Sequence, residues 1–144
     1  MDKFNFDKVI NRLETMKSQL PTRLANQAQT HFVQTFDKQG FDNKPWKEVQ
    51  RRIEGTKAYK YIKPQSWRTS PILVNTGKLW QKVAASIRDV SFSMIRLVVA
   101  LPYAKYLNEG TGKMVKRHFM GDSIDLRRKH KTKINEEIKK AWHL

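Results

Sequence analysis

The sequence predicts an α+β fold, because helical periodicity dominates both ends of the chain and a short β-rich run lies between them. Apolar residues recur every three or four positions through residues 4–36, as expected of an amphipathic helix. The run Ile95–Leu101 is the strongest strand signal. A second helix is expected over Ser123–Ala141. With 144 residues, the chain has the length of one domain, and we expect residues 1–144 to form one.

Two apolar stripes predict the N-terminal helix. The first contains Phe6, Val9, Ile10, Leu13, Met16 and Leu20, and the second contains Leu24, Ala28, Phe32 and Phe36. Pro21 lies between them. Because proline lacks an N–H and clashes with the preceding turn, the pattern fits either two helices or one bent helix, and we favour the bent helix. Gly40 is the expected helix end, since glycine tolerates the left-handed conformation.

Residues 41–70 form a basic, aromatic-rich loop region. Turn formers are frequent here, and four Trp and Tyr residues lie among eight Lys and Arg. A structureless loop of this length is uncommon in a compact domain. We therefore expect one or two helical turns within Pro45–Ile53 and a remainder that becomes ordered on a partner.

The segment from residue 72 to the last helix predicts short elements. Thr76 and Gly77 open a short helix that begins at Lys78. An antiparallel hairpin follows, with its turn expected near Arg88–Ser91. The next expected elements are a short helix over 102–107, a strand over 115–120 that ends at Gly121, and an N-cap at Asp122 with Asp125 in the first helical turn.

The net charge of +16 suggests an anionic partner. The chain has 29 Lys and Arg against 13 Asp and Glu, with the excess concentrated in residues 41–70 and 113–144. Self-repulsion of this size is unfavourable unless an anion or acidic protein offsets it. Nucleic acid is one candidate partner. A solvated basic surface, or one that meets an acidic protein, fits equally well.

The sequence gives little support for catalysis. Cysteine is absent, which excludes a thiolate nucleophile, a thiolate metal site and a disulfide. No two of the four histidines have the i, i+4 spacing of a helical metal site. No pair of carboxylates can be assigned to one cavity, and Gly110-Thr-Gly112 lacks the spacing of a phosphate-binding loop. We expect a non-enzymatic protein with no catalytic residue, metal or cofactor.

No apolar run approaches the length needed to cross a bilayer, and the N-terminus lacks the features of a signal peptide. We therefore expect a soluble protein that is made in the cytoplasm and has no membrane partner.

Four motifs, in order, resemble the phage virion morphogenesis family, the tail-completion proteins of Mu-like prophages. They are Phe36-Asp-Lys-Gln-Gly40 followed by Trp46, then Ile72-Leu-Val-Asn-Thr-Gly-Lys-Leu79, then Tyr103-Ala104 with Asn108-Glu-Gly110, and finally Arg117-His-Phe-Met-Gly121. The resemblance spans about residues 32–140. Leu107 departs from the family, in which His often precedes Asn-Glu-Gly, and the basic segment at 55–70 is longer than a minimal member needs.

The resemblance implies a tail-terminator-like α+β domain, in which a long N-terminal helix and a C-terminal helix pack on a small antiparallel β-sheet. It also implies a structural role in tail completion or head–tail joining, assembly into a homo-oligomeric ring, and other tail or neck proteins as partners. The protein would lie in the host cytoplasm during assembly and then in the virion tail or neck. The family supplies no catalytic residues.

Two sets of residues follow as candidates. The interface or DNA candidates are Trp46, Arg51, Arg52, Tyr59, Lys60, Tyr61, Lys63, Trp67 and Arg68 in the loop region, with Arg127, Arg128, Lys129 and Lys131 in the last helix. The structural motif candidates are Gly40, Thr76, Gly77, Tyr103, Glu109, Gly110, Arg117, Phe119 and Gly121. We expect Arg117 to pair with Glu109 across the Asn108–Gly110 corner.

The alternative function is a cytosolic nucleic-acid-binding protein unrelated to virions. In that case the loop aromatics would stack on bases while nearby lysines and arginines meet phosphates. Aromatic residues and Arg are also enriched at protein interfaces. Because of the family resemblance, we favour the protein interface and keep non-specific DNA contact as a possible addition.

Overall fold

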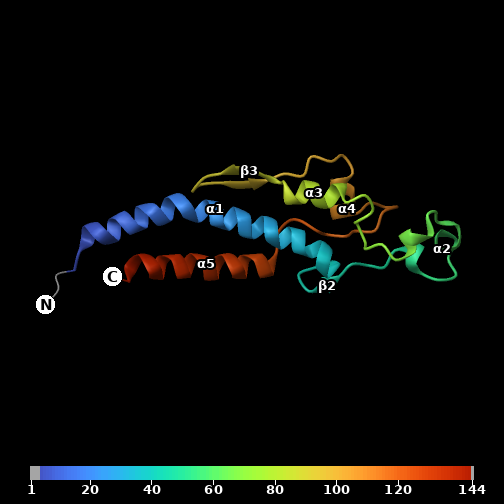
Figure 1. Ribbon diagram of the computed structural model, residues 1–144, viewed down its shortest axis with the longest axis horizontal. Coiled ribbons are helices and arrows are strands. Elements are labelled where there is room, and N and C mark those ends of the chain that lie inside the picture. Colours follow the sequence, from blue (N-terminus) through green and yellow to red (C-terminus); the bar gives the residue numbers. More distant parts are fainter. Residues whose placement is uncertain (1–3, 144) are drawn as a thin grey trace.

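Two long helices, one from each end of the chain, lie side by side along the molecule (Figure 1). They are α1 (Phe6–Lys38) and α5 (Ile124–Trp142) in a computed structural model that describes residues 4–143. A hairpin of β3 (Ile87–Val90) and β4 (Ile95–Leu97) packs on α1 and lies on the opposite side of it from α5. The molecule is therefore elongated, with α1 in its middle layer.

The α+β class is confirmed, but the sheet differs from the expected one. The strands form two separate two-stranded antiparallel sheets, β1–β2 and β3–β4. Helix α5 packs mainly on α1 rather than on a sheet. The expected packing of both terminal helices on one sheet is therefore wrong, because α1 lies between the hairpin and α5.

Helix α1 is one continuous helix of 33 residues that includes Pro21, which confirms a single N-terminal helix. Figure 1 shows it arching along its length. The helix ends one residue earlier than expected, because Gln39 adopts the left-handed conformation with a φ of 52°. Gly40 is instead the first residue of β1. A Cβ there would lie 2.5 Å from the Lys44 carbonyl oxygen, so the close approach of the two strands requires glycine.

The strands β1 (Gly40–Phe41) and β2 (Lys44–Pro45) form a small hairpin after α1. Its two-residue turn is Asp42-Asn43, and both residues have positive φ, 45° and 61°. Two positive φ values are typical of the type I′ turn, which matches the twist of the flanking strands. The turn brings Asp42 to the start of α5, where it makes the contacts described below.

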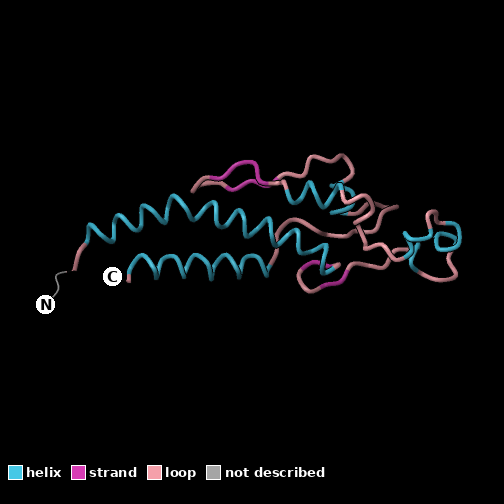
Figure 2. Tube along the Cα trace, viewed as in Figure 1, coloured by secondary structure: helices cyan, strands magenta, loops and turns pink. Residues whose placement is uncertain are grey.

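Residues 47–70, which we call the arm, extend from the end of the molecule opposite the start of α1 and the end of α5 (Figure 1). The arm contains η1 (Gln50–Arg52), α2 (Lys57–Tyr61) and η2 (Gln65–Arg68). Figure 2 shows these short helices joined by loops. The arm is thus partly helical by itself. The expected helical turns within Pro45–Ile53 are reduced to the single 3-10 turn η1.

Helix α3 (Lys78–Ala84) begins after Thr76-Gly77 as expected, with Gly77 in the left-handed conformation. The following hairpin has its turn at residues 91–94 rather than near Arg88–Ser91, since β3 already includes Arg88. The strand signal at Ile95–Leu101 yields only three residues of β4. Helix α4 (Ala104–Glu109) confirms a short helix here, but it begins and ends two residues later than the expected 102–107, and its C-cap is Gly110.

Two expectations near the last helix are wrong. Residues 115–120 are loop rather than strand, because side-chain contacts described below take the place of a partner strand. The N-cap of α5 is Ser123 rather than Asp122: the Ser123 hydroxyl accepts a hydrogen bond from the Leu126 N–H at 3.1 Å. Asp122 instead pairs with Arg127. The first turn of α5 does contain an acidic residue, as expected.

The core lies where the C-terminal half of α1 meets the four motif segments. Phe36 packs against Trp46 and Phe119, with ring centroids 5.7 Å apart in both pairs. Segments that are far apart in the sequence therefore converge on one apolar cluster, and the motifs act as scaffold. Other buried members of this cluster are Ile72, Leu79, Val83, Ala104 and Leu126.

Candidate assembly surface

Trp46 is not available as an interface or stacking residue. Its ring is buried against Phe36, and its indole Nε1 donates a hydrogen bond to the His118 carbonyl at 2.7 Å. The prediction that Trp46 binds a partner is therefore wrong. The surrounding Lys and Arg suggested an exposed side chain, but the aromatic cluster of α1 buries it.

Two arginines of the arm point inward, and Arg51 is the first. It donates from Nε to the Trp67 carbonyl at 2.9 Å and from Nη2 to the Ser70 and Pro71 carbonyls at 2.9 and 3.0 Å. Burial lowers the pKa of Arg51 from its usual value. These bonds tie η1 to the far side of the arm, so Arg51 holds the arm in shape.

Arg68 acts similarly at the tip of the arm. Its guanidinium stacks on the Tyr59 ring at 4.3 Å, and its Nε donates to the Tyr59 carbonyl at 2.8 Å. Tyr59 and Arg68 therefore contact each other, which leaves them less available to a partner. The loop-region candidates that remain exposed are Arg52, Lys60, Tyr61, Lys63 and Trp67.

The basic stretch of α5 is partly neutralised within the chain. Arg127 pairs with Asp122, and Arg128 lies 3.5 Å from Asp125. The third basic residue, Lys129, is half-buried against α1. Lys131 is exposed and takes part in none of the ion pairs among residues 4–143. This helix therefore offers less free positive charge than its sequence suggests.

The Asn108–Gly110 corner is structural, but Arg117 does not pair with Glu109. Arg117 Nε instead donates to the Lys47 carbonyl at 3.1 Å, which fixes the base of the arm. The Asn108 side chain accepts from the N–H groups of Phe119 and Met120 and donates to the Met120 carbonyl. Sequence reasoning placed Asn108 in a motif without recognising this role, which only the three-dimensional contact reveals.

Four of the remaining six motif residues also serve the scaffold. A Cβ at Gly110, whose φ is 78°, would lie 3.0 Å from Lys116, and one at Gly121 would lie 2.8 Å from the His118 ring. The Thr76 hydroxyl accepts from the Lys78 N–H at 3.4 Å. Of the other three motif residues, Phe119 is buried, whereas Tyr103 and Glu109 are exposed.

A surface of exposed apolar side chains lies on the N-terminal half of α1 and on the tip of the β3–β4 hairpin. On α1, Phe6 and Ile10 are 69% and 53% exposed; on the hairpin, Phe92 and Met94 are 65% and 50% exposed. Lys17 of α1 lies beside the hairpin tip, since its Nζ is 5.5 Å from the Phe92 ring centroid. Residues 6, 10 and 17 share one face of a helix. We call Phe6, Ile10, Phe92 and Met94 the apolar surface.

In the described part of the chain no third strand pairs with the β3–β4 hairpin, so both of its strands are edge strands. A free edge presents unpaired N–H and C=O groups, to which another strand can add. The ion pair between Arg96 and Asp89 neutralises two of the hairpin's charges. The hairpin is therefore a nearly uncharged element in a strongly basic protein.

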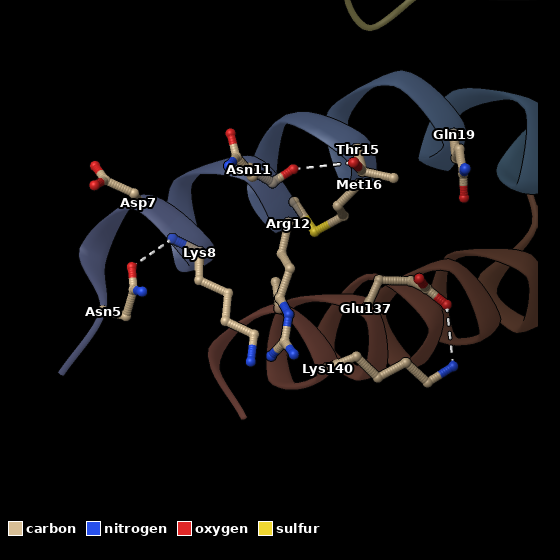
Figure 3. A pocket seen from close by; sticks show the side chains of 11 residues that line it. Asn5, Asp7, Lys8, Asn11, Arg12, Thr15, Met16, Gln19, Glu137 and Lys140 are labelled. Atoms are coloured by element: carbon tan, nitrogen blue, oxygen red, sulfur yellow. Dashed lines mark hydrogen bonds and ion pairs between the residues drawn. The ribbon is translucent and has the colours of Figure 1, made fainter. Parts of the chain in front are cut away.

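A polar groove of about 610 Å³ lies between the N-terminal half of α1 and the end of α5. Figure 3 shows Lys8 and Arg12 of α1 reaching toward α5. Arg12 donates to a carbonyl just after α5, where the helix dipole favours a cation. Across the groove, Glu137 accepts from Lys140 and lies 2.7 Å from Arg23. The Arg12 and Arg23 contacts join α1 to the C-terminal end of the chain, and the residues lining the groove include no pair of groups arranged for acid–base chemistry.

A buried polar network fixes the start of α5. The Ser123 hydroxyl donates to Asp42 and lies 3.0 Å from His31 Nε2. Burial raises the pKa of Asp42, but hydrogen bonds from Ser123 and from the Ile124 and Asp125 N–H groups outweigh it, so the net shift is downward. Because Ser123 lies between Asp42 and His31, the carboxylate does not orient the imidazole toward a nucleophile, unlike in a catalytic triad.

No group of three or more His, Asp or Glu side chains between residues 4 and 143 is placed to hold a metal ion. Within the same residues, no helix is both long and apolar enough to cross a bilayer. No protein-family model, curated protein or solved structure matches the chain. The resemblance to the phage virion morphogenesis family therefore stays a prediction.

Proposed function

We propose that this chain is a non-enzymatic structural protein of a phage virion, which acts in tail completion or head–tail joining by associating with copies of itself and with tail or neck proteins. It would assemble in the host cytoplasm and remain in the virion tail or neck. The observation that carries the proposal is the apolar surface, which includes the tip of a hairpin made of two edge strands. In the predicted family role, this surface would bind another copy of the chain.

A second copy of the chain is the occupant that fits the hairpin. A strand edge is completed by another strand, and the β3–β4 hairpin of a second copy supplies one. Two chains of charge +16 repel each other. They can approach most easily where charge is low: the charged residues within 87–99 are Arg88, Asp89 and Arg96, and Lys17 of α1 lies beside Phe92. Burial of Phe92 and Met94 would then favour association.

The four motifs support a structural role. Their residues build the core, the Asn108 hydrogen-bond cluster and the Arg117 contact at the base of the arm. These groups are engaged in packing and in hydrogen bonds to the backbone. A protein whose motif residues hold a rigid body in shape is suited to work by surface complementarity.

Replacing both Phe92 and Met94 with Ser tests the proposal. We expect the purified wild-type protein to form a defined oligomer in high salt without nucleic acid, and the double variant to be monomeric. Burying a large apolar side chain contributes about 1.5–3 kcal/mol to the free energy of association, and the variant loses this contribution at both positions. Light scattering after size exclusion gives the mass of each species.

Tyr106→Ser is the matched control, because Tyr106 is 53% exposed on α4, outside the apolar surface. This variant should assemble like the wild type. An oligomer that persists unchanged in the Phe92→Ser, Met94→Ser protein would contradict the proposed contact. The phage role has its own test: capsid, portal or tail genes beside the coding gene support it, and their absence counts against it.

A further inference from the structure

The arm contains positive charge that its own acidic groups do not neutralise. It has seven Lys and Arg against two Glu. Glu48 pairs with Arg52 at 3.5 Å. Lys57, Lys60 and Lys63 are exposed, and none of them takes part in the ion pairs formed among residues 4–143. The outer part of the arm therefore presents three free cations.

Two aromatic rings lie exposed among these lysines. Tyr61 at the end of α2 is 68% exposed and Trp67 in η2 is 38% exposed. Lys57, Lys60 and Tyr61 share one side of α2, since side chains three and four positions apart are neighbours. The Lys60 ammonium lies 5.4 Å from the centroid of the Tyr61 ring. The Lys60 ammonium therefore meets one face of the Tyr61 ring, and the 68% exposure of Tyr61 leaves ring surface for a base.

The arm is also held in shape before any ligand binds. Arg51 and Arg68 hydrogen-bond to carbonyls across the arm, and the Arg68 guanidinium covers the Tyr59 ring. Arg51, Tyr59 and Arg68 are therefore engaged within the arm, whereas the exposed lysines and aromatic rings remain available to a partner. A preorganised surface loses less entropy on binding than a mobile loop does.

We propose that the arm binds single-stranded nucleic acid, with Tyr61 and Trp67 stacking on bases and Lys57, Lys60 and Lys63 contacting phosphates. Exposed aromatic rings interleaved with cations suit a strand whose bases are unpaired, because every base offers a face for stacking. In duplex DNA the bases are already stacked on each other. This proposal is independent of self-association, which we assign to the apolar surface.

Fluorescence anisotropy of a labelled oligothymidylate, titrated with the full chain, tests the proposal. Tyr61→Ala and Trp67→Ala should each weaken binding by roughly tenfold. Tyr61→Phe and Trp67→Phe keep an aromatic face and should retain most of the affinity. The Lys57→Gln, Lys60→Gln, Lys63→Gln triple variant should lower the slope of log K against log salt by about 2, since a single strand gives about 0.7 per phosphate contact.

The matched control is the Lys82→Gln, Lys105→Gln, Lys139→Gln variant, which removes the same charge from exposed positions outside the arm. It should change affinity much less than the arm triple variant. Equal losses in the two variants would overturn the proposal, because net charge alone would then explain binding. Unchanged affinity in both alanine variants, or equal competition by polyglutamate, would also overturn it. Light scattering of the same variants reports self-association separately.

Discussion

The His31 imidazole lies in a hydrogen-bond network that joins three elements and depends on its protonation state. The only hydroxyl hydrogen of Ser123 goes to Asp42, so Ser123 accepts from the N–H at His31 Nε2. Nδ1 then carries the lone pair and accepts from the Lys129 ammonium, which lies 3.3 Å away. The network therefore requires a neutral imidazole, and it ties α1, the β1–β2 turn and the start of α5 together.

We predict that acidification below about pH 6.5 destabilises the fold. Burial and the nearby Lys129 lower the pKa of His31, and burial also lowers the pKa of His130. In the unfolded chain both histidines bind a proton near pH 6.5, whereas in the folded chain they do so only at lower pH. The free energy of unfolding therefore decreases as pH falls through this range, by at most about 1.4 kcal/mol per pH unit for each histidine.

Chemical denaturation of His31→Gln at several pH values checks this prediction. Glutamine can donate to Ser123 and accept from Lys129, so the network is kept while the titration is lost. The variant should show a weaker pH dependence between about pH 7.5 and 5.5 than the wild type. An identical pH profile in the two proteins would show that the protonation of His31 is not coupled to folding.

The contribution of His130 is separated by making His130→Gln as a parallel variant. Each single variant removes one of the two titrations, so each should lose part of the pH dependence of stability. The double variant should lose more of it than either single variant, since the folded pKa of both histidines lies below the unfolded value of about 6.5.

At the scale of elements, the arm depends on side-chain contacts to carbonyls rather than on a core of its own. The residues of η1, α2 and η2 are all exposed or half-buried. The three hydrogen bonds from Arg51 span the arm from η1 to the segment after η2. A region with few buried apolar contacts opens at low free energy, so loss of these bonds should affect the arm before the rest of the molecule.

We predict that Arg51→Ala loosens the arm while leaving the α1–α5 pair intact. Amide hydrogen exchange in residues 50–71 should become faster by about tenfold or more, because hydrogen bonds to a charged group each contribute roughly 1.5–3 kcal/mol. Arg52→Ala is the matched control, since Arg52 is exposed and has one surface ion pair with Glu48. Equal exchange in both variants would contradict the role assigned to Arg51.

The elements that the sequence predicts well are those with a long, regular pattern. The periodicity in α1 and α5 predicts both helices to within a few residues, whereas their ends depend on local contacts. Gln39 ends α1 because its side chain bonds to the Phe36 and Ile72 carbonyls, and Ser123 begins α5 because it also meets Asp42. Ile72 and Asp42 are distant in sequence from the helix ends they fix, so no local pattern reveals them.

The candidate site was predicted less completely than the fold. Tyr61 and Trp67 are exposed as expected. Trp46, in contrast, is buried in the core, and Arg51 and Arg68 donate hydrogen bonds to carbonyls within the arm. Composition identifies a basic aromatic segment without telling which side chains face inward. That choice depends on carbonyls and rings brought close only by folding.

At the scale of the whole molecule, the apolar stripe over residues 6–20 is only partly buried within the chain. Val9 and Leu20 are buried within the chain, whereas Phe6 and Ile10 of that stripe are exposed. Periodicity alone cannot separate these cases, because a helix face that packs inside one chain and a face that packs between chains have the same pattern. The elongated shape leaves the exposed part uncovered (Figure 1).

The dependence on salt distinguishes self-association through this surface from association through bound nucleic acid. The repulsion between two chains of charge +16 is screened as ionic strength rises, whereas apolar contacts and strand pairing are not weakened. Association of this kind should therefore strengthen with salt. Association that depends on bound nucleic acid should weaken, because salt displaces phosphate contacts.

The measurement that tests the central claim most directly is sedimentation velocity of the nucleic-acid-free protein, over a range of protein concentrations, in low and in high salt. Our account predicts an oligomer whose fraction rises with both concentration and salt, and which the Phe92→Ser, Met94→Ser variant fails to form. A wild-type protein that stays monomeric at every concentration and ionic strength would contradict it.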